Sequence, residues 1–171
     1  MQLAEDIRRI RTTISYSGKM LIRTADELDI PEVVEMSKRM HAEGPYSRLP
    51  FDEAKVYEIG AWMSHPKSKY WGAIAEYNSR PVGMVIAYYS EVLCCRAIQT
   101  FDVVLYSDKN VRGSFAGLKL IHAYIGWAKS IGAVDCNIIA SGMYNNEGTY
   151  KLLQRLGFEP AGGLFKMVLG D

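Results

Sequence analysis

The sequence predicts one α/β domain of about six strands and four or five helices. Three observations carry this prediction. The length of 171 residues matches the commonest size of a single domain. Apolar residues recur at every second position in some segments, as in strands, and at steps of three and four in others, as in helices. Neither a repeat nor a low-complexity stretch divides the chain.

The composition excludes several classes of function. The formal charge is +1, so no bulk field draws the protein to nucleic acid or to a membrane, and a bound anion must be held locally. Cys94, Cys95 and Cys136 have the spacing of neither a zinc site nor a disulfide framework. The sequence contains neither a membrane-length apolar run nor a signal peptide. We therefore expect a cytoplasmic protein with no metal, nucleic-acid or membrane partner.

The first expected element is a short helix over residues 3–16. Its apolar side chains recur at steps of four, three and four, at Leu3, Ile7, Ile10 and Ile14. This seam packs either on the protein's own domain or against a second copy of the chain in a homodimer. We treat residues 1–18 as an N-terminal helical extension and residues 19–171 as the single domain.

A strand and two helices are expected next. Residues 20–25 are strand-like, and Asp29 with Glu32 three residues later predicts a capped helix through about Met40. The segment 44–50 breaks the chain with glycine and two prolines. A second helix is then expected from a cap at Asp52 to about Met63. Three strand-like runs follow at 69–77, 81–89 and 97–106, the first two joined by a hairpin turn at 78–80.

The last third predicts two helices and more strands. A helix begins near residue 113 and ends at Gly132. Its expected buried stripe is Leu118, Ile121, Ile125 and Ala128. Residues 133–140 alternate as a strand that buries Val134, Cys136 and Ile138. A helix closed by Gly157 and closing strands over 158–169, with a turn at Gly162 and Gly163, complete the chain.

The start of the helix near residue 113 predicts an anion site. Residues 110–117 read NVRGSFAG. The first N–H groups of a helix lack internal partners, and its N-terminal end carries roughly half a positive charge. Gly113 and Gly117 allow close approach, Ser114 caps or donates, and Arg112 adds a cation. The spacing is that of neither a P-loop nor a dinucleotide fingerprint, and a capped core helix with a surface arginine is the alternative.

From about Met20 to Leu169, the chain resembles the GNAT superfamily of N-acetyltransferases. The family's pyrophosphate loop, R/Q-x-x-G-x-G/A, matches RGSFAG with Arg112 and Gly117 in register and Phe115 in place of the first glycine. The family's second motif, N-x-x-A-x-x-x-Y-x-x-x-G-F, matches at Asn146, Gly157 and Phe158, with Thr149 in place of alanine and Leu153 in place of tyrosine. The resemblance implies a mixed, mostly antiparallel central sheet flanked by helices.

The resemblance also implies acetyl-CoA as the cosubstrate. Its pyrophosphate would lie on the N–H groups of residues 113–118, its pantetheine arm would pair with the strand end at 105–107, and Asn146 would reach the arm from the other side. The thioester would lie in the gap between the fourth and fifth strands of the family fold. The implied cofactor-binding residues are Leu105, Tyr106, Ser107, Arg112, Gly113, Ser114, Phe115, Ala116, Gly117, Leu118 and Asn146.

The expected chemistry needs a base. An amine with a pKa of about 10 must lose a proton before it attacks a thioester. Asp102 is the catalytic candidate because burial between Phe101 and Val103 would raise its pKa, although a solvated or structurally paired aspartate is the alternative. Gln99 lies where some relatives keep a glutamate and cannot accept the proton. Further candidates for the base are Glu43 and Glu91.

For the acid, the family tyrosine is replaced by Leu153, and Tyr150 lies about 4.5 Å away along the helix axis. Tyr150 is the candidate proton donor, with a packing or acceptor-site role as the alternative and Tyr144 as a weaker candidate. Release without a side-chain acid is also feasible, because a thiol with a pKa of about 8.5 is a fair leaving group.

The expected function is acetyl transfer to a primary amine of a small molecule or peptide. A rival hypothesis, favoured by Phe115 and Leu153, is a GNAT-fold module that binds acyl-CoA or a partner protein without turnover. An unrelated α/β protein is the third hypothesis, and it would bind no CoA. The acceptor cannot be read from the sequence, since the segment 41–53 and the last hairpin are short and chemically mixed.

Overall fold

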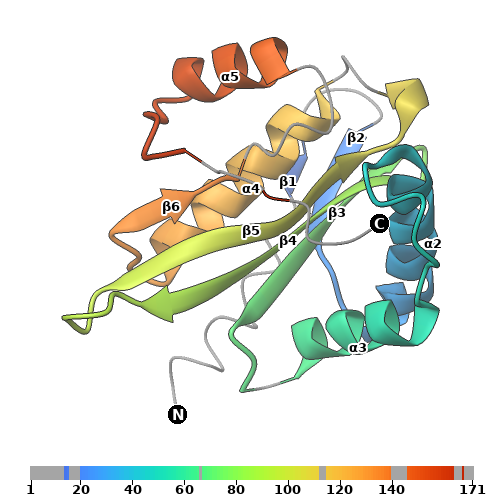
Figure 1. Ribbon diagram of the computed structural model, residues 1–171, viewed down its shortest axis with the longest axis horizontal. Helices are drawn as coiled ribbons and strands as arrows, with labels where there is room; N and C mark the ends of the chain where they lie inside the picture. Colours follow the sequence, from blue (N-terminus) through green and yellow to red (C-terminus); the bar gives the residue numbers. More distant parts are fainter. Residues whose placement is uncertain are drawn as a thin grey trace. The chain divides into compact units, whose positions relative to one another are not determined.

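The computed structural model describes residues 14–15, 20–65, 67–111, 115–139, 146–163 and 167. The chain divides into two compact units, Met1–Ile138 and Ile139–Asp171. In the first unit, a six-stranded sheet has the spatial order β1-β2-β3-β4-β5-β6 (Figure 1). The strands are β1 (Ile14–Ser15), β2 (Met20–Thr24), β3 (Tyr70–Tyr77), β4 (Arg80–Glu91), β5 (Ile98–Ser107) and β6 (Asp135–Asn137). Neighbouring strands are antiparallel except β5 and β6, which confirms the predicted mixed, mostly antiparallel sheet.

Helices cover both faces of this sheet. The described α-helices of the first unit are α2 (Ile30–Glu43), α3 (Glu53–Ser64) and α4 (Ala116–Ser130), and its described 3-10 helices are η1 (Glu27–Asp29) and η2 (Lys109–Val111). Helices α2 and α3 lie on one face and α4 on the other (Figure 1). The sheet is therefore buried from both sides.

Side chains alternate between the two faces of the sheet along each strand, so the core has two layers. The α4 layer lies between the sheet and α4, and the α2 layer lies between the sheet and α2. In β3, Ala73 and Ala75 pack with the α4 layer, whereas Ile74 packs with the α2 layer. In β4, Val85 and Ala87 belong to the α4 layer. The α4 layer is completed by Leu120, Tyr124 and Trp127, and the α2 layer by Val33, Met36, Met84 and Ile86.

The start of the described chain differs from the expected helix. Ile14 and Ser15 form β1, which pairs antiparallel with Ile22 and Leu21 of β2. The predicted helix over 3–16 is thus wrong at Ile14 and Ser15, because pairing satisfies backbone groups along an otherwise open edge of β2. Residues 1–13, which hold the rest of the apolar seam, lie outside the described residues.

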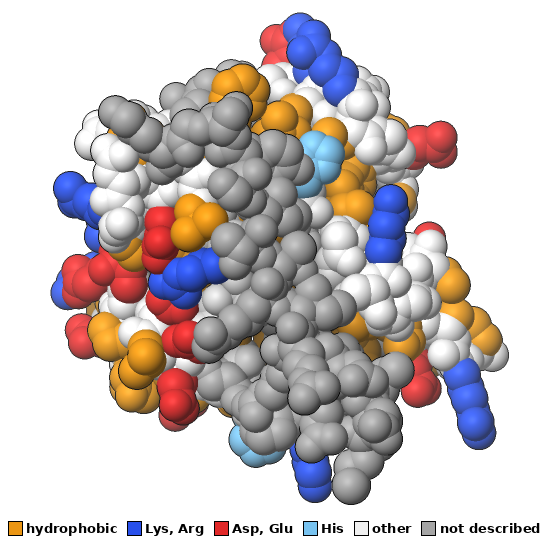
Figure 2. Space-filling model, turned by 180° about the vertical axis from the view of Figure 1, so that it is seen from behind, with side chains coloured by type: hydrophobic (Ala, Val, Ile, Leu, Met, Phe, Trp, Pro, Cys, Tyr) orange, Lys and Arg blue, Asp and Glu red, His pale blue; other side chains and the backbone are white. Residues whose placement is uncertain are grey.

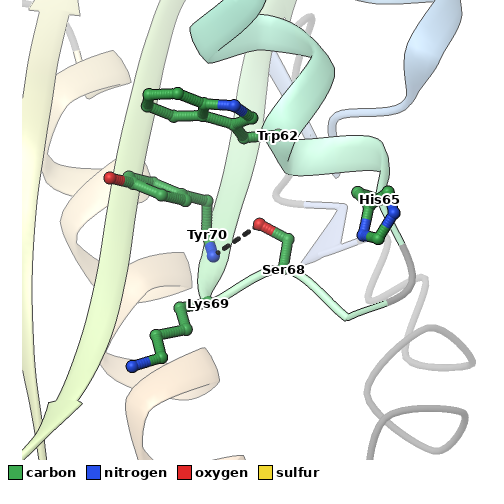
Figure 3. Close-up of a pocket in the computed structure, with 5 residues that line it drawn as sticks. All are labelled: Trp62, His65, Ser68, Lys69 and Tyr70. Carbon is green, nitrogen blue, oxygen red and sulfur yellow. Dashed lines mark hydrogen bonds between the residues drawn. The ribbon is translucent and has the colours of Figure 1, made fainter.

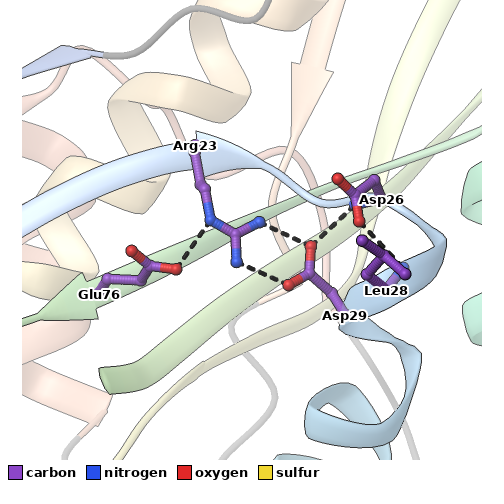
Figure 4. A network of polar contacts seen from close by, with 5 residues as sticks. All are labelled: Arg23, Asp26, Leu28, Asp29 and Glu76. Atoms are coloured by element: carbon purple, nitrogen blue, oxygen red, sulfur yellow. Dashed lines mark hydrogen bonds and ion pairs between the residues drawn. The ribbon is translucent and has the colours of Figure 1, made fainter. Parts of the chain in front are cut away.

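The first helical segment is capped one turn earlier than expected. Asp26 caps η1, with its side chain accepting from Leu28 N (2.9 Å), and Asp29 Oδ2 accepts from Asp26 N (2.8 Å). Asp29 precedes α2 but makes no side-chain cap to it. Instead, Arg23 of β2 donates two hydrogen bonds to the Asp29 carboxylate (2.6 and 2.7 Å) and one to Glu76 of β3 (2.8 Å) (Figure 4). This network ties two strands to the start of α2.

Two other local predictions are confirmed. The side chain of Asp52 caps α3 by accepting from Lys55 N at 3.0 Å. Asn78 and Ser79 adopt positive φ angles of 51° and 62° between β3 and β4, which is the geometry of a two-residue hairpin turn. The strands that flank the turn therefore pair in the predicted order.

The buried face of α4 is rotated from the predicted stripe. Ile121 and Ala128 are buried as expected, but Leu118 and Ile125 are only partly buried. The core face includes Leu120, Tyr124, Trp127 and Ile131, at steps of four, three and four. Gly132, with φ of 72°, follows the helix as predicted. Strand β6 is shorter than expected, and Val134 is 62% exposed because it precedes the strand.

The second unit contains α5 (Asn146–Arg155), which ends before Gly157 with φ of 89°, as predicted. Glu147 and Lys151 form an ion pair along this helix at 2.6 Å. The expected closing strands fall partly outside the described residues, and residues 158–163 form no strand. On the described part of the surface in Figure 2, acidic and basic side chains are interspersed, in agreement with the near-zero net charge.

Candidate functional site

The sheet opens where β5 and β6 part. Parallel pairing joins residues 99–101 of β5 to residues 135–137 of β6, and this ladder ends at Phe101 and Asn137. Strand β5 continues to Ser107 and remains paired with β4 on its other edge. Among the described residues, the opposite edge of 102–107 therefore has no strand beside it. Backbone groups on such an edge can pair with an extended ligand.

A β-bulge lies at the beginning of this edge. Ile86 pairs with Val104 and Ala87 pairs with Asp102, so Val103 is the extra residue on β5. Val103 is 43% exposed. A bulge turns backbone groups out of the regular ladder, which makes this position a candidate donor for an oxyanion.

The start of α4 is accessible at Gly117. Phe115 precedes the helix with no side-chain cap, and the hydrogen bond from Lys119 N to Phe115 O (2.9 Å) closes the first turn. A Cβ added at Gly117 would meet no described atom within 4 Å. The Phe115 side chain is 70% exposed, so it is not packed over a buried helix end. The N–H groups of a first helical turn can therefore face a ligand here.

The predicted anion-binding residues are described only in part. Arg112, Gly113 and Ser114 lie outside the described residues. Ala116 is buried in the α4 layer, and Leu118 is partly buried. The structure thus offers an open glycine on the first turn, while the arginine's contribution stays a prediction from sequence.

At the end of β5, the three predicted residues differ in their surroundings. Leu105 packs with the α4 layer, and Ser107 is partly buried opposite Gly83. Tyr106 is buried, and its hydroxyl donates to Asp108 Oδ1 at 2.9 Å. Burial, reinforced by the Asp108 carboxylate, raises the pKa of Tyr106 to about 12. Its side chain is therefore a structural donor.

Gly83 holds β4 close to this part of β5. A Cβ at Gly83 would lie 2.8 Å from the carbonyl oxygen of Tyr106 and 3.3 Å from the Cα of Ser107. Such contact with backbone atoms could be relieved only by moving β5 away from β4. The glycine thus fixes the position of the strand that forms the candidate site.

Charged groups near Tyr106 are paired. Asp108 Oδ1 also accepts from Arg39 Nε at 3.0 Å, and Arg39 reaches Glu32 at 3.4 Å. Glu43, one of the further candidates for the base, has a side chain 12% exposed and forms an ion pair with Lys109 at 3.8 Å. These contacts anchor the end of β5 to α2.

Asp102 lies on the α4 side of the sheet. It is two residues from Thr100, whose hydroxyl oxygen is 2.9 Å from the Tyr124 hydroxyl. Burial raises the pKa values of Tyr124 and Cys136, and the charge of Asp102 acts in the same direction on both. Asp102 therefore lies beside a buried polar cluster at the end of the β5–β6 ladder. Gln99, at an odd step from Thr100, belongs to the opposite face.

The predicted residues of the second unit are described within α5. Asn146 is the first residue of this helix. Tyr150 is 49% exposed, whereas Leu153 is buried. Tyr150 belongs to this unit and Asp102 to the first, so the structure does not define them as a pair. Tyr144 lies outside the described residues.

A surface pocket of about 330 Å³ lies at the end of α3. The rings of Trp62 and Tyr70 face each other at 5.1 Å between centroids, and Ser68 Oγ accepts from Tyr70 N at 3.0 Å (Figure 3). His65 and Lys69 complete its lining, which holds no carboxylate. This pocket was not predicted from the sequence, because its residues come from the end of α3, the loop after it and the start of β3, and they form no motif.

The described residues contain neither a group of side chains placed to bind a metal ion nor a helix that could span a membrane. No group of three or more His, Cys, Asp or Glu side chains there is arranged to hold a metal ion. None of the helices described combines the length and apolar composition that crossing a membrane requires.

Comparisons with known proteins agree with this geometry. Residues 33–158 match the model of the family described as the acetyltransferase (GNAT) family. A search of curated proteins finds no significant match.

Solved structures with the same fold include three named acetyltransferases. An aminoglycoside acetyltransferase from an uncultured soil metagenomic sample, in complex with sisomicin, has a TM-score of 0.69 and 16% identity, covering 89% of this chain and 97% of that one. A ribosomal-protein-alanine N-acetyltransferase from Brucella melitensis biovar Abortus 2308 has a TM-score of 0.69 and 15% identity, covering 88% and 99%. AAC(6')-Iy, in complex with the bisubstrate analog CoA-S-monomethyl-acetylneamine, has a TM-score of 0.66 and 19% identity, covering 89% and 99%.

Proposed function

Because the chain belongs to the GNAT acetyltransferase family, we propose that it transfers the acetyl group of acetyl-CoA to a primary amine by direct attack of the amine on the thioester. The observation that carries this proposal is the parting of β5 from β6 beside a bulge on β5. The position of residues 102–107 beyond the β5–β6 ladder supports an extended pantetheine arm there, and the open first turn of α4 at Gly117 supports the pyrophosphate. The end of β5 and the first turn of α4 thus fit the pantetheine arm and the pyrophosphate of acetyl-CoA.

The protein must assist the reaction in three ways. The amine must be deprotonated, the developing oxyanion must receive hydrogen bonds, and the thiolate must leave. We assign the oxyanion contact to a backbone N–H at the bulge around Val103. Asp102, the first residue of β5 past its ladder with β6, is the proposed base, and Tyr150 is the proposed proton donor. The roles of both side chains are proposed from the sequence.

The acceptor is a primary amine on a small molecule or a peptide. The structural neighbours include an aminoglycoside acetyltransferase and a ribosomal-protein-alanine N-acetyltransferase, whose names indicate acceptors of both kinds. We place the reaction in the reducing cytoplasm, since none of the three cysteines is spaced as in a disulfide framework.

The direct test combines binding with turnover. We expect CoA and acetyl-CoA to bind in isothermal titration calorimetry, and we expect free thiol to appear when acetyl-CoA is mixed with a reactive amine from a panel of polyamines, aminoglycosides and peptides. Binding without thiol release for any amine would favour the acyl-CoA-binding module instead. No binding of either nucleotide would exclude both functions.

An Asp102→Asn variant tests the base. We expect kcat/KM to fall about a hundredfold, the lower range for loss of a general base, with little change in the affinity for CoA. The rate should be measured by thiol release against pH, because an amide cannot take up a proton. A variant with wild-type kcat/KM at every pH would remove Asp102 from the mechanism.

A further inference from the structure

We propose that Tyr124 is a positioning residue of the acyl-transfer site, whose hydroxyl group fixes the point at which β5 and β6 part. The inference rests on the proposed function, because the gap beyond that point is where the thioester would lie. Tyr124 comes from the middle of α4 and belongs to none of the motifs in the sequence.

The hydroxyl group of Tyr124 contacts both strands at the end of their ladder. It donates to the carbonyl oxygen of Asn137 on β6 at 2.9 Å and is hydrogen-bonded to Thr100 Oγ1 on β5, also at 2.9 Å. Thr100 pairs with Cys136, and the next and last pair is Phe101 with Asn137. One phenol group therefore bridges the two strands directly before they separate.

The side chain of Asn137 adds a second bridge. Its Nδ2 donates to the carbonyl oxygen of Thr100 at 3.0 Å. Backbone carbonyl groups of both strands thus accept hydrogen bonds from side chains at this level. These side-chain bridges hold β6 to β5 where the backbone ladder is only three residue pairs long.

The aromatic ring of Tyr124 is held rigidly. It stacks on Trp71 with centroids 6.5 Å apart and on Trp127 at 6.1 Å, and the two tryptophans stack on each other at 5.1 Å and 6°. Tyr124 is 0% exposed. A ring confined in this way delivers its hydroxyl to one position, so the bridge is a fixed point rather than an adaptable contact.

The hydroxyl keeps its proton at neutral pH. Burial raises the pKa of Tyr124, although the contact with Thr100 acts in the opposite direction. Thr100 is also 0% exposed, and buried hydroxyl groups need hydrogen-bond partners. The pair is therefore a neutral, satisfied bridge with no proton to exchange in the reaction.

Helix α4 connects the two ends of the proposed binding site. Tyr124 lies eight residues after Ala116, which corresponds to about 12 Å along the helix axis. The first turn would hold the pyrophosphate, and Tyr124 would set the gap for the thioester. Loss of the hydroxyl should therefore disturb the acyl end and leave the pyrophosphate end unchanged.

Tyr124→Phe is the main test, since it removes the hydroxyl and keeps the stacked ring. We expect kcat per CoA-binding site to fall about tenfold through misplacement of the thioester. The Kd for CoA should stay within about threefold, a free-energy change well below one charge-assisted contact. Hydrogen–deuterium exchange of the free protein should become faster at residues 135–139. Thr100→Val should act in the same direction, and Thr100→Ser, which keeps the hydroxyl, should retain wild-type turnover.

Arg23→Met is the control for loss of stability alone, because Arg23 is bonded to Asp29 and Glu76 and to neither strand of the gap. It should keep its turnover per CoA-binding site. If Tyr124→Phe keeps wild-type turnover per site, or if exchange at 135–139 is unchanged, the positioning role is wrong while the proposed function stands. If the wild-type protein binds no CoA, the proposed function fails and the inference fails with it.

Discussion

A Gly117→Glu variant is expected to lose about a thousandfold in affinity for CoA. Two like charges about 4 Å apart interact by about 4 kcal/mol at the effective dielectric of a protein surface, and a glutamate on the first turn of α4 would oppose the proposed pyrophosphate. The fold should tolerate the change, because an added Cβ meets no described atom within 4 Å. An acidic side chain on a first turn also favours the helix. Calorimetry with CoA and thermal unfolding measure the two effects separately.

Gly126→Glu provides a matched control on the same helix. Gly126 is exposed, a Cβ there also meets no described atom within 4 Å, and the change in net charge is identical. This variant should bind CoA like the wild-type protein, because residue 126 lies beyond the first turn. Equal affinities for the Gly117 and Gly126 variants would refute the proposed pyrophosphate position.

An Arg23→Met variant is expected to lose about 3 kcal/mol of unfolding free energy. Removal of one partner from a buried ion pair leaves the other charge without compensation. The Asp29 side chain is 9% exposed, and it receives two hydrogen bonds from Arg23. The Arg23 network also joins β2 to β3 through Glu76 (Figure 4). Urea unfolding at pH 7 measures the loss.

The loss should depend on pH in a defined direction. Burial alone would raise the pKa of Asp29, but Arg23 and the backbone N–H of Asp26 lower it below its ordinary value. A carboxyl with a lowered folded-state pKa stabilises the protein above its unfolded-state pKa, about 3.9, and loses this contribution as the pH falls through the folded-state value. The difference between wild type and Arg23→Met should therefore be largest near pH 7 and shrink below about pH 4.

Lys38→Met is the control for the Arg23 experiment. The Lys38 side chain is 54% exposed, and its ion pairs with Glu35 and Glu53 measure 3.8 and 4.0 Å. Exposed pairs of this kind contribute at most about 1 kcal/mol. Losses of equal size for the two variants would show that burial of Asp29 does not determine the effect.

Local sequence signals predicted most of the fold. The cap at Asp52, the turn at Asn78 and Ser79, and the glycine after α4 each depend on a few neighbouring residues, and each is confirmed. The capping of α2 was mispredicted because Arg23, on the preceding strand, engages the Asp29 carboxylate, and Asp26 caps η1 instead. Sequence spacing does not encode this competition.

Only those parts of the candidate site that are formed by neighbouring residues could be predicted from the sequence. The helix start near Gly117 carries a local pattern that sequence analysis can find. The bridge made by Tyr124 to Thr100 and Asn137 joins three elements and leaves no pattern. Ile121 and Ala128 are buried as predicted, but packing against the sheet selects a face that includes Tyr124 and Trp127 in place of Leu118 and Ile125. That choice requires knowledge of the partner surface.

The spatial order of the strands repeats their order along the chain, and this has a consequence for folding. During synthesis, each antiparallel strand emerges next to a neighbour that already exists. Strand β6 differs, because a parallel neighbour requires the chain to return through α4 before it can join. Because β6 follows β5 and α4 along the chain, the strand beside the proposed ligand gap is the last of the described strands to be synthesised.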